Sequence, residues 1–328
     1  MTTFAPASRV TALRRSAVRA MLAPSIHNTQ PWRMHLHQGR LDVYADRSRR
    51  LSVLDPTGRQ LLISCGCAVM NARVSLAASG VGVDITRATH PTQEDLLASL
   101  VPSGQALDPG LVALDAVIEL RQTNRRQFAD EQVPDAVLDV LQEAAAVEGA
   151  SLFVVRREED RIAVATLSQY ADQIENLNPA YRAELRAWTT EDPSRRDGVA
   201  DMAVPHVDGT AQDDVPIRDF DTHGKGRLPA ATHSSRNQTM ALLCTNGDSP
   251  AEWLRAGEAL ERVLLEITRH GYSASPLTQM TEMPSTRAQL RRELHITGYP
   301  HLLLRIGRAP IVASSRRRRL VDVLVDES

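Results

Sequence analysis

The stretch APSIHNTQPW, residues 23–32, is the most informative part of the chain. It separates a segment with helical periodicity from one with alternating polarity, so it is predicted to be a short loop between a helix and a strand. A proline near each end fixes the backbone φ. The polar residues between them donate and accept hydrogen bonds, as the edge of a flat heterocycle requires. A polar turn beside a buried Trp32 accounts for the same residues, so the loop alone leaves both interpretations open.

Outward from this loop, the sequence repeats itself. An apolar helical pattern that ends in glycine covers 59–80 and recurs at 250–271, and the common offset of 191 carries Gly66 onto Gly257. A second pair of helix-then-strand patterns has an offset near 121. The difference of about 70 residues predicts an insertion in the second copy. Two copies are too few for a solenoid and indicate a fused dimer.

The repeat divides the 328 residues into a first unit at 1–110 and a second unit at 111–328. The insertion, at about 189–235, is rich in Pro, Gly, Asp and His and has little periodicity. A segment this long is typical of a lid, a binding segment or a solvated loop. Its histidines lack the close spacing of metal ligands, so no metal site is expected.

The composition excludes several classes of protein. With 42% hydrophobic residues, 24% charged residues and a net charge of −2, the chain is ordinary for a globular protein and has no strong field for nucleic acid or an anionic membrane. No apolar run predicts a membrane span, and no secretory pattern opens the sequence. Cys65, Cys67 and Cys244 are too few for a disulfide framework, and the pair Cys65 and Cys67 is expected to be two buried thiols. We therefore expect a cytoplasmic protein.

The local patterns predict an α+β protein with more helices than strands. The predicted helices cover about 10–22, 57–79, 111–121, 134–146, 160–187, 250–270 and 285–294. The predicted strands cover about 32–37, 41–45, 81–86, 151–156, 240–245 and 301–307.

The loop at 23–32 resembles the flavin-ring loop of the FMN-dependent nitroreductase superfamily, whose pattern is close to A-P-S-x-x-N-x-Q-P-W. The doubled unit resembles the Acg-type branch of actinobacteria, in which two such units are fused in one chain. The resemblance implies a nitroreductase-like α+β fold, with antiparallel-type central sheets flanked by helices and two units interlocked as an intrachain pseudo-dimer. It also implies that five loop residues lie at the isoalloxazine ring, namely Pro24, Ser25, Ile26, Asn28 and Gln30. Two roles are left open for His27, proton donation near the ring and a packing or surface role, and the packing or surface role is favoured.

A second motif follows the first unit. Arg121, Thr123 and Arg125 match the family's phosphate motif, which is approximately R-R/H-S-x-R/K-x-F, and Gln122 departs from it by replacing the usual basic residue. Arginine forms forked, charge-assisted hydrogen bonds to phosphate, and a Thr hydroxyl adds a donor. A solvated arginine-rich surface is the alternative.

The arginine run at 316–319 resembles the basic pair that closes the family's phosphate site near the C-terminus. Alternate residues of an extended chain share a face, so Arg317 and Arg319 are the predicted pair, with a shift of one residue left open. A basic surface run is the alternative.

The loop after the second long helix, 271–278, resembles the family segment whose backbone N–H groups approach flavin N5 and O4. Pro276, Leu277 and Thr278 are therefore predicted to lie near the ring, with a strand end in the core as the alternative. The first unit has the ring loop and the second has the phosphate motif. The two units together therefore predict one FMN per chain.

The resemblance implies an oxidoreductase in which NADPH or NADH reduces the flavin at N5, and the flavin then reduces a nitroaromatic or quinone-type acceptor. The cofactor carries this chemistry, so no catalytic side chain is named. The alternative function is an FMN-sequestering, storage or sensing protein whose lid prevents turnover. A scaffold whose motifs have decayed is a third interpretation. A monomer is favoured because fusion removes the need for a dimer, and a homodimer is left open.

Overall fold

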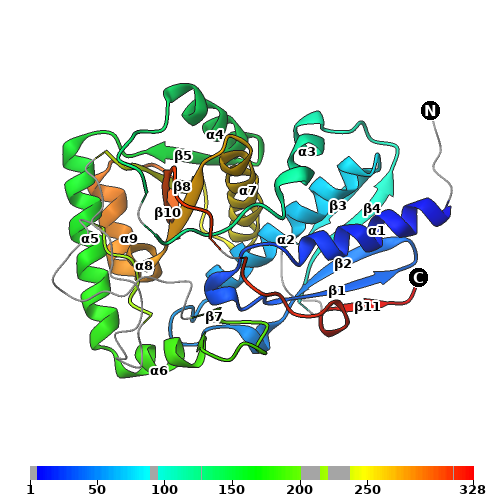
Figure 1. Ribbon diagram of the computed structural model, residues 1–328, viewed down its shortest axis with the longest axis horizontal. Coiled ribbons are helices and arrows are strands. Elements are labelled where there is room, and N and C mark those ends of the chain that lie inside the picture. The colour runs from blue at the N-terminus through cyan, green and yellow to red at the C-terminus, as the bar shows by residue number, and fades with distance from the viewer. Residues whose placement is uncertain (1–5, 89–94, 127, 201–214, 221–236, 313) are drawn as a thin grey trace.

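The chain folds into two sheet-and-helix halves with two long helices between them (Figure 1). The computed structural model describes the 328 residues except 1–5, 89–94, 127, 201–214, 221–236 and 313. In Figure 1 the blue-to-cyan half contains β1–β4, and the green-to-orange half contains β5, β8 and β10. Helices α2 and α7 lie between these two sheets.

The first half follows the order helix, two strands, helix, two strands. Its main elements are α1 (Pro6–Ala20), β1 (Trp32–His37), β2 (Arg40–Ala45), α2 (Arg59–Ala78), β3 (Gly82–Arg87) and β4 (Leu96–Ser103). Short helices connect it onward, namely η1 (Ile26–Asn28), η2 (Arg47–Arg49), α3 (Pro109–Leu114) and η3 (Asp115–Val117).

The second half repeats this order and adds helices within it. Its main elements are α4 (Asp135–Val147), β5 (Ala150–Val154), β8 (Thr239–Thr245), α7 (Pro250–Arg269), β9 (Ser273–Leu277) and β10 (Tyr299–Gly307). The added elements are α5 (Glu158–Leu177), α6 (Pro179–Ala187), β6 (Thr189–Thr190), β7 (Val199–Ala200), α8 (Gln279–Glu282) and α9 (Pro284–Glu293). The chain ends with η5 (Leu320–Asp322) and β11 (Leu324–Asp326).

The two sheets share one strand order. The first is β1-β2-β4-β3 and the second is β5-β8-β10-β9, and all of these neighbours are antiparallel. The α+β class with antiparallel central sheets is therefore confirmed. The sequence repeat predicts two related units but no strand order. The division at residue 110 stays a prediction. Strand β11 departs from the shared strand order, because it is added in parallel to β1 at the edge of the first sheet.

Helices α2 and α7 cross at two glycines that the sequence offset of 191 relates. A Cβ on Gly66 would lie 2.8 Å from the Gly257 Cα, and a Cβ on Gly257 would lie 2.8 Å from the Gly66 Cα. Each added Cβ would also clash with a carbonyl of the other helix, that of Leu254 or of Ile63. Only glycine allows this backbone contact. One hydrophobic core, to which both halves contribute, surrounds the crossing.

A buried ion-pair cluster joins the halves beside this crossing. Arg73 of α2 donates to Glu148 at 2.6 Å and to Glu258 of α7 at 2.7 Å. Arg87 of β3 forms two further hydrogen bonds with Glu258, and Arg262 of α7 donates to Glu148 at 2.8 Å. Burial alone would raise the pKa of Glu148, but Arg73 and Arg262 hold it below its usual value. The two sheets therefore belong to one folded body.

Most predicted elements are present within a few residues of their expected bounds. The long helix predicted at 160–187 is divided into α5 and α6, because Asn178 caps a new helix that Pro179 begins. Strands β4, β6, β7, β9 and β11 are not among the predicted strands. Helix α2 is, within the described ranges, the one helix long and apolar enough to cross a membrane, and the rest of the protein covers it. Much of the insertion, including His206, His223 and His233, lies outside the described residues.

Candidate functional site

The loop at 23–32 has a backbone that ordinary side chains rarely adopt. His27, Asn28 and Gln30 have φ values of 45°, 54° and 49°. Such left-handed residues cost about 1–3 kcal/mol each and gather at functional sites. Within the loop, the Gln30 N–H donates to Ser25 Oγ at 2.9 Å. The Ile26 N–H attaches the loop to α2 by donating to Ser64 Oγ at 3.1 Å. The strained loop is therefore held rigidly against the first long helix.

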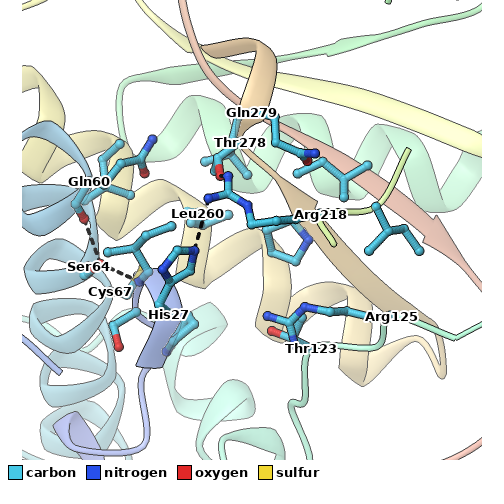
Figure 2. Close-up of a pocket in the computed structure, with 18 of the residues that line it drawn as sticks. His27, Gln60, Ser64, Cys67, Thr123, Arg125, Arg218, Leu260, Thr278 and Gln279 are labelled. Atoms are coloured by element: carbon cyan, nitrogen blue, oxygen red, sulfur yellow. Dashed lines mark hydrogen bonds between the residues drawn. The ribbon is translucent and has the colours of Figure 1, made fainter. Parts of the chain in front are cut away.

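A cavity of about 100 Å³ lies between the two halves, against α2, α7 and this loop (Figure 2). It brings together eight of the residues predicted from the sequence, from three segments that are far apart in the chain. They are Pro24, Ser25, Ile26, Thr123, Arg125, Pro276, Leu277 and Thr278. Sequence reasoning missed the walls that the long helices supply, namely Gln60, Ser64 and Cys67 of α2 and Leu260 of α7.

A second cavity of about 370 Å³ adjoins the first, since Thr123 and Arg125 line both. Asn28 lines this second cavity, where its amide donates to the carbonyls of Gly198 and Arg316 at 3.0 and 3.1 Å. Arg126 and Arg316 also line it. Neither was predicted, although both lie beside predicted residues.

The predicted residue Gln30 lies behind the loop, away from both cavities. It is fully buried, and its amide bridges two segments by accepting from the Arg318 N–H at 2.7 Å and donating to the Arg196 carbonyl at 2.9 Å. Its position indicates a role in placing the loop against the C-terminal segment.

Arg121 and Arg317 lie next to each other behind the loop, and neither lines a cavity. Both donate to the Leu22 carbonyl, at 3.3 and 3.2 Å. Arg121 is buried and forms an ion pair with Glu261 of α7, with Nε 3.4 Å from Oε1. Arg317 also donates to Asn28 Oδ1 at 3.1 Å. Both arginines therefore support the loop.

The structure does not bring Arg319 to the site. Its side chain is 65% exposed and pairs with Asp322 at 3.0 Å, within the turn that starts η5. The alternation of an extended chain fails here because the backbone turns into a helix at Leu320. Arg318 points inward instead, and its guanidinium donates to the Gln30 carbonyl at 3.2 Å.

Arg125 lies at the junction of the two cavities without an acidic partner among the described residues. Its guanidinium lies over the Phe220 ring, 5.4 Å from the centroid, and forms no hydrogen bond or ion pair within that part of the chain. Burial, together with the nearby Arg218, lowers its pKa to about 10. An uncompensated guanidinium in such a place favours an anionic ligand.

Arg218 of the insertion occupies the centre of the first cavity (Figure 2). Only 6% of its surface is exposed. Its guanidinium contacts His27 Nε2 at 3.1 Å, Thr278 Oγ1 at 3.2 Å and Glu282 Oε1 at 2.7 Å. The sequence signal for this segment is the stretch VPIRDF, residues 215–220, which is rich in apolar residues inside a polar insertion.

Behind Arg218 lies a buried acidic group. Burial and the neighbouring Glu282 raise the pKa of Glu175 to about 9, and the Tyr181 hydroxyl donates to Glu175 at 2.9 Å. Burial alone would lower the pKa of Arg218, but the carboxylate of Glu282 holds that pKa above its usual value. Arg218 is therefore charged and paired with Glu282, and burial beside Glu282 favours the neutral form of Glu175.

His27 is buried in the cavity wall, as the packing interpretation expected. Burial lowers its pKa well below the usual value, and Arg218 and Arg125 lower it further. It is therefore neutral at pH 7. Its ring contacts Phe220 edge-on, at 5.5 Å between centroids.

Cys65 and Cys67 are free and buried, as predicted, and Cys244 is free and buried as well. Burial raises the pKa of each thiol, to about 12 for Cys244. Within the described ranges, no group of three or more His, Cys, Asp or Glu side chains is arranged to hold a metal ion.

Comparison with known proteins gives a consistent set of relatives, although no protein-family model matches the chain. A Mycobacterium tuberculosis protein provisionally named an NAD(P)H nitroreductase is 33% identical, over 98% of this chain and 93% of its own length. The M. tuberculosis protein Acg, named in the same way, is 29% identical over 90% of this chain and 89% of its own.

Similar solved structures cover part of the chain. A nitroreductase with bound FMN from Desulfitobacterium hafniense is 12% identical, covers 63% of this chain and 94% of its own, and has a TM-score of 0.40. The FMN-dependent nitroreductase NfnB of Mycobacterium smegmatis, in complex with NADPH, is 17% identical, covers 64% and 96%, and has a TM-score of 0.37.

Proposed function

The chain belongs to the NAD(P)H nitroreductase family, and from that premise we propose that it is an FMN-dependent oxidoreductase. NADPH or NADH supplies hydride, and a small nitroaromatic or quinone-type molecule accepts the electrons. One FMN is held per chain, because both halves of a single chain line the candidate site.

The observation that carries this proposal is Arg125 at the junction of two adjoining cavities. A ligand with a flat ring at one end and a phosphate at the other suits such a pair of cavities. The phosphate end would accept hydrogen bonds from the Arg125 guanidinium and the Thr123 hydroxyl, which line both cavities. Arg126 and Arg316 extend the positive charge into the second cavity. The donor set therefore fits the anionic end of FMN.

The ring end would lie against the loop at 24–26 and the segment at 276–278. Bound FMN supplies a ring that accepts hydride and passes electrons on. Three buried apolar side chains line the first cavity, namely Ile63, Leu260 and Leu302. They would orient the ring and exclude water from it. No described side chain is required as a nucleophile, so none is named as catalytic.

Space at the ring end depends on Arg218. The first cavity, at about 100 Å³, is smaller than the roughly 300–1,000 Å³ of most small-ligand sites. Arg218 lies in the middle of this space (Figure 2), and Phe220 also lines it. The residues fit FMN chemically, and the ring is accommodated when these two side chains move aside.

This occupation favours a second candidate function, in which the chain holds FMN with little reductase turnover. The described part of the insertion already enters the site, as a lid over a single cofactor would. Stopped-flow mixing with NADPH separates the two functions. Rapid loss of flavin absorbance supports the oxidoreductase, whereas no loss in the full chain and rapid loss after trimming of residues 190–235 supports the sequestering protein.

The decisive experiment for both functions is purification without added cofactor, followed by absorbance and flavin quantification. We expect a flavin spectrum and close to one FMN per chain. A colourless preparation that also fails to bind added FMN contradicts both functions and favours a scaffold whose motifs have decayed.

A further inference from the structure

A buried carboxylate that the proposed chemistry does not use lies behind the flavin loop. Glu261 of α7 has no exposed surface, and neither of its oxygens accepts a well-formed hydrogen bond from the residues that the structure describes. A carboxylate in such a position opposes folding. Unsatisfied groups of this kind in a folded core call for a functional explanation.

Groups from three elements face this carboxyl. Arg121 approaches from the segment after η3, with Nε 3.4 Å from Glu261 Oε1. Asn71 and Cys67 face it from α2, and Arg317 faces it from the C-terminal segment. Burial and Glu261 raise the pKa of the Cys67 thiol well above its usual value, so that thiol stays neutral. The charged neighbours of Glu261 are therefore the two arginines.

These two arginines converge on the loop that leads into the site. Each donates to the Leu22 carbonyl, and Arg317 also holds Asn28, which lines the second cavity. Among the described residues, the Nε atoms of Arg121 and Arg317 have no hydrogen-bond partner. Two guanidinium groups thus share one buried counter-ion behind the loop, and Arg121 precedes Thr123 by two residues in the chain.

We propose that Glu261 is a proton-linked positioning residue for the phosphate end of the cofactor. When a phosphate-bearing ligand binds beside Thr123 and Arg125, its negative charge raises the electrostatic cost of an ionised Glu261 behind the loop and is itself attracted by Arg121 and Arg317. Glu261 then takes up one proton from water and becomes a neutral carboxylic acid. The proposal rests on the proposed function, because it requires a ligand whose phosphate lies at that junction.

The direction of the pH dependence follows from charge. Burial raises the pKa of Glu261 to about 7 although Arg121 opposes the shift, so both protonation states are available near neutral pH. The protonated state leaves two arginines for the ligand, whereas the ionised state neutralises one. Affinity for a phosphate-bearing flavin is therefore higher below pH 7 and falls above it, by at most about tenfold per pH unit for one linked proton.

The test compares FMN with riboflavin, which has the same ring and lacks the phosphate. Flavin-free full-length protein is titrated from pH 5.5 to 8.5 and followed by flavin fluorescence. Relative to Glu261→Gln, wild-type affinity for FMN should fall about three- to tenfold between pH 6 and 8. Ionisation of the FMN phosphate changes the affinity of both proteins equally with pH, so its effect cancels when wild type is compared with this variant. Riboflavin should show no such difference.

Glu266→Gln is the matched control, because Glu266 is another buried glutamate of α7 that pairs with Arg269 at the helix end. It should keep the wild-type pH profile. If Glu261→Gln fails to fold, calorimetry of wild-type protein in buffers of different ionisation enthalpy measures the protons exchanged. FMN should take up more protons than riboflavin near pH 7.

The outcomes separate failure of the proposed function from failure of the role proposed for Glu261. Absence of FMN binding at every pH contradicts the proposed function. FMN binding with the same pH profile in wild type and Glu261→Gln, or calorimetry without excess proton uptake, overturns the role of Glu261 alone.

Discussion

Replacement of Arg218 by leucine should increase the affinity for FMN. In the closed site, the Arg218 guanidinium forms one ion-paired hydrogen bond with Glu282 and two further contacts, with His27 and Thr278. A ligand ring that enters the first cavity has to displace these contacts. Leucine retains an apolar side chain but makes none of them, so the closed state loses its principal anchor.

The magnitude follows from the contacts that are lost. A hydrogen bond to a charged group contributes about 1.5–3 kcal/mol net, and the two weaker contacts add about 1 kcal/mol together. Part of this is offset, because Glu282 is left buried and shares its surroundings with the protonated Glu175. A net gain of about 2 kcal/mol remains, which corresponds to roughly thirty-fold tighter FMN binding.

Fluorescence titration of flavin-free protein measures this affinity, and stopped-flow mixing should show faster FMN association. Arg157→Leu is the control, since it removes an ion pair with Asp160 at the start of α5, away from the cavities. It should bind FMN as wild type does. Unchanged or weaker binding by Arg218→Leu would refute the idea that Arg218 competes with the ring, and weaker binding would make it a ligand contact.

Three further predictions concern the anion site, the helix crossing and the ion-pair cluster. Arg125→Gln should weaken FMN binding about 10- to 150-fold, through loss of charged hydrogen bonds worth about 1.5–3 kcal/mol, whereas the exposed Arg33→Gln should have no effect in the same titration. Gly257→Ala should reduce the free energy of unfolding by about 3 kcal/mol or more in urea denaturation. The control Gly271→Ala should reduce it by only about 1 kcal/mol, because a Cβ at Gly271 meets no described atom within 4 Å and only its positive φ is unfavourable. Equal losses in the two variants would contradict the close crossing of the helices. Because the folded-state pKa of Glu148 is lowered, its stabilisation is complete above about pH 4.5 and is lost as pH falls through the folded-state pKa. Glu148→Gln should therefore be less stable at pH 7 by about 3 kcal/mol and show a flatter acid limb.

The sequence predicted the elements whose periodicity is strong and whose boundaries have clear signals. Helix α7 is an example, because Pro250 begins it and Gly271 follows its end. Strand β4 was missed because it directly precedes a region without a clear pattern, and its partners are set by tertiary pairing with β2 and β3. Sheet pairing of this kind depends on distant residues, which local propensity does not report.

The candidate site shows the same limit. The motif residues that line the cavities could be found from the sequence, because the loop and the segment at 276–278 follow predicted elements directly. The roles of Arg121 and Arg317 could not, since each depends on Glu261 or on the Leu22 carbonyl, which lie far away in the chain. Arg218 was hidden because nothing local indicates that a segment of the insertion returns to the site.

The pairing of β11 with β1 has a consequence for synthesis of the chain. About 290 residues separate the two strands, so the outer edge of β1 lacks its β11 partner until residues 324–326 have left the ribosome. At about 5–20 residues per second, this edge stays open for roughly 15–60 s. An open strand edge invites pairing with other chains. A nascent chain of this protein is therefore expected to need chaperone cover until residues 324–326 emerge, and truncation before residue 324 should produce aggregates even though both long helices are complete.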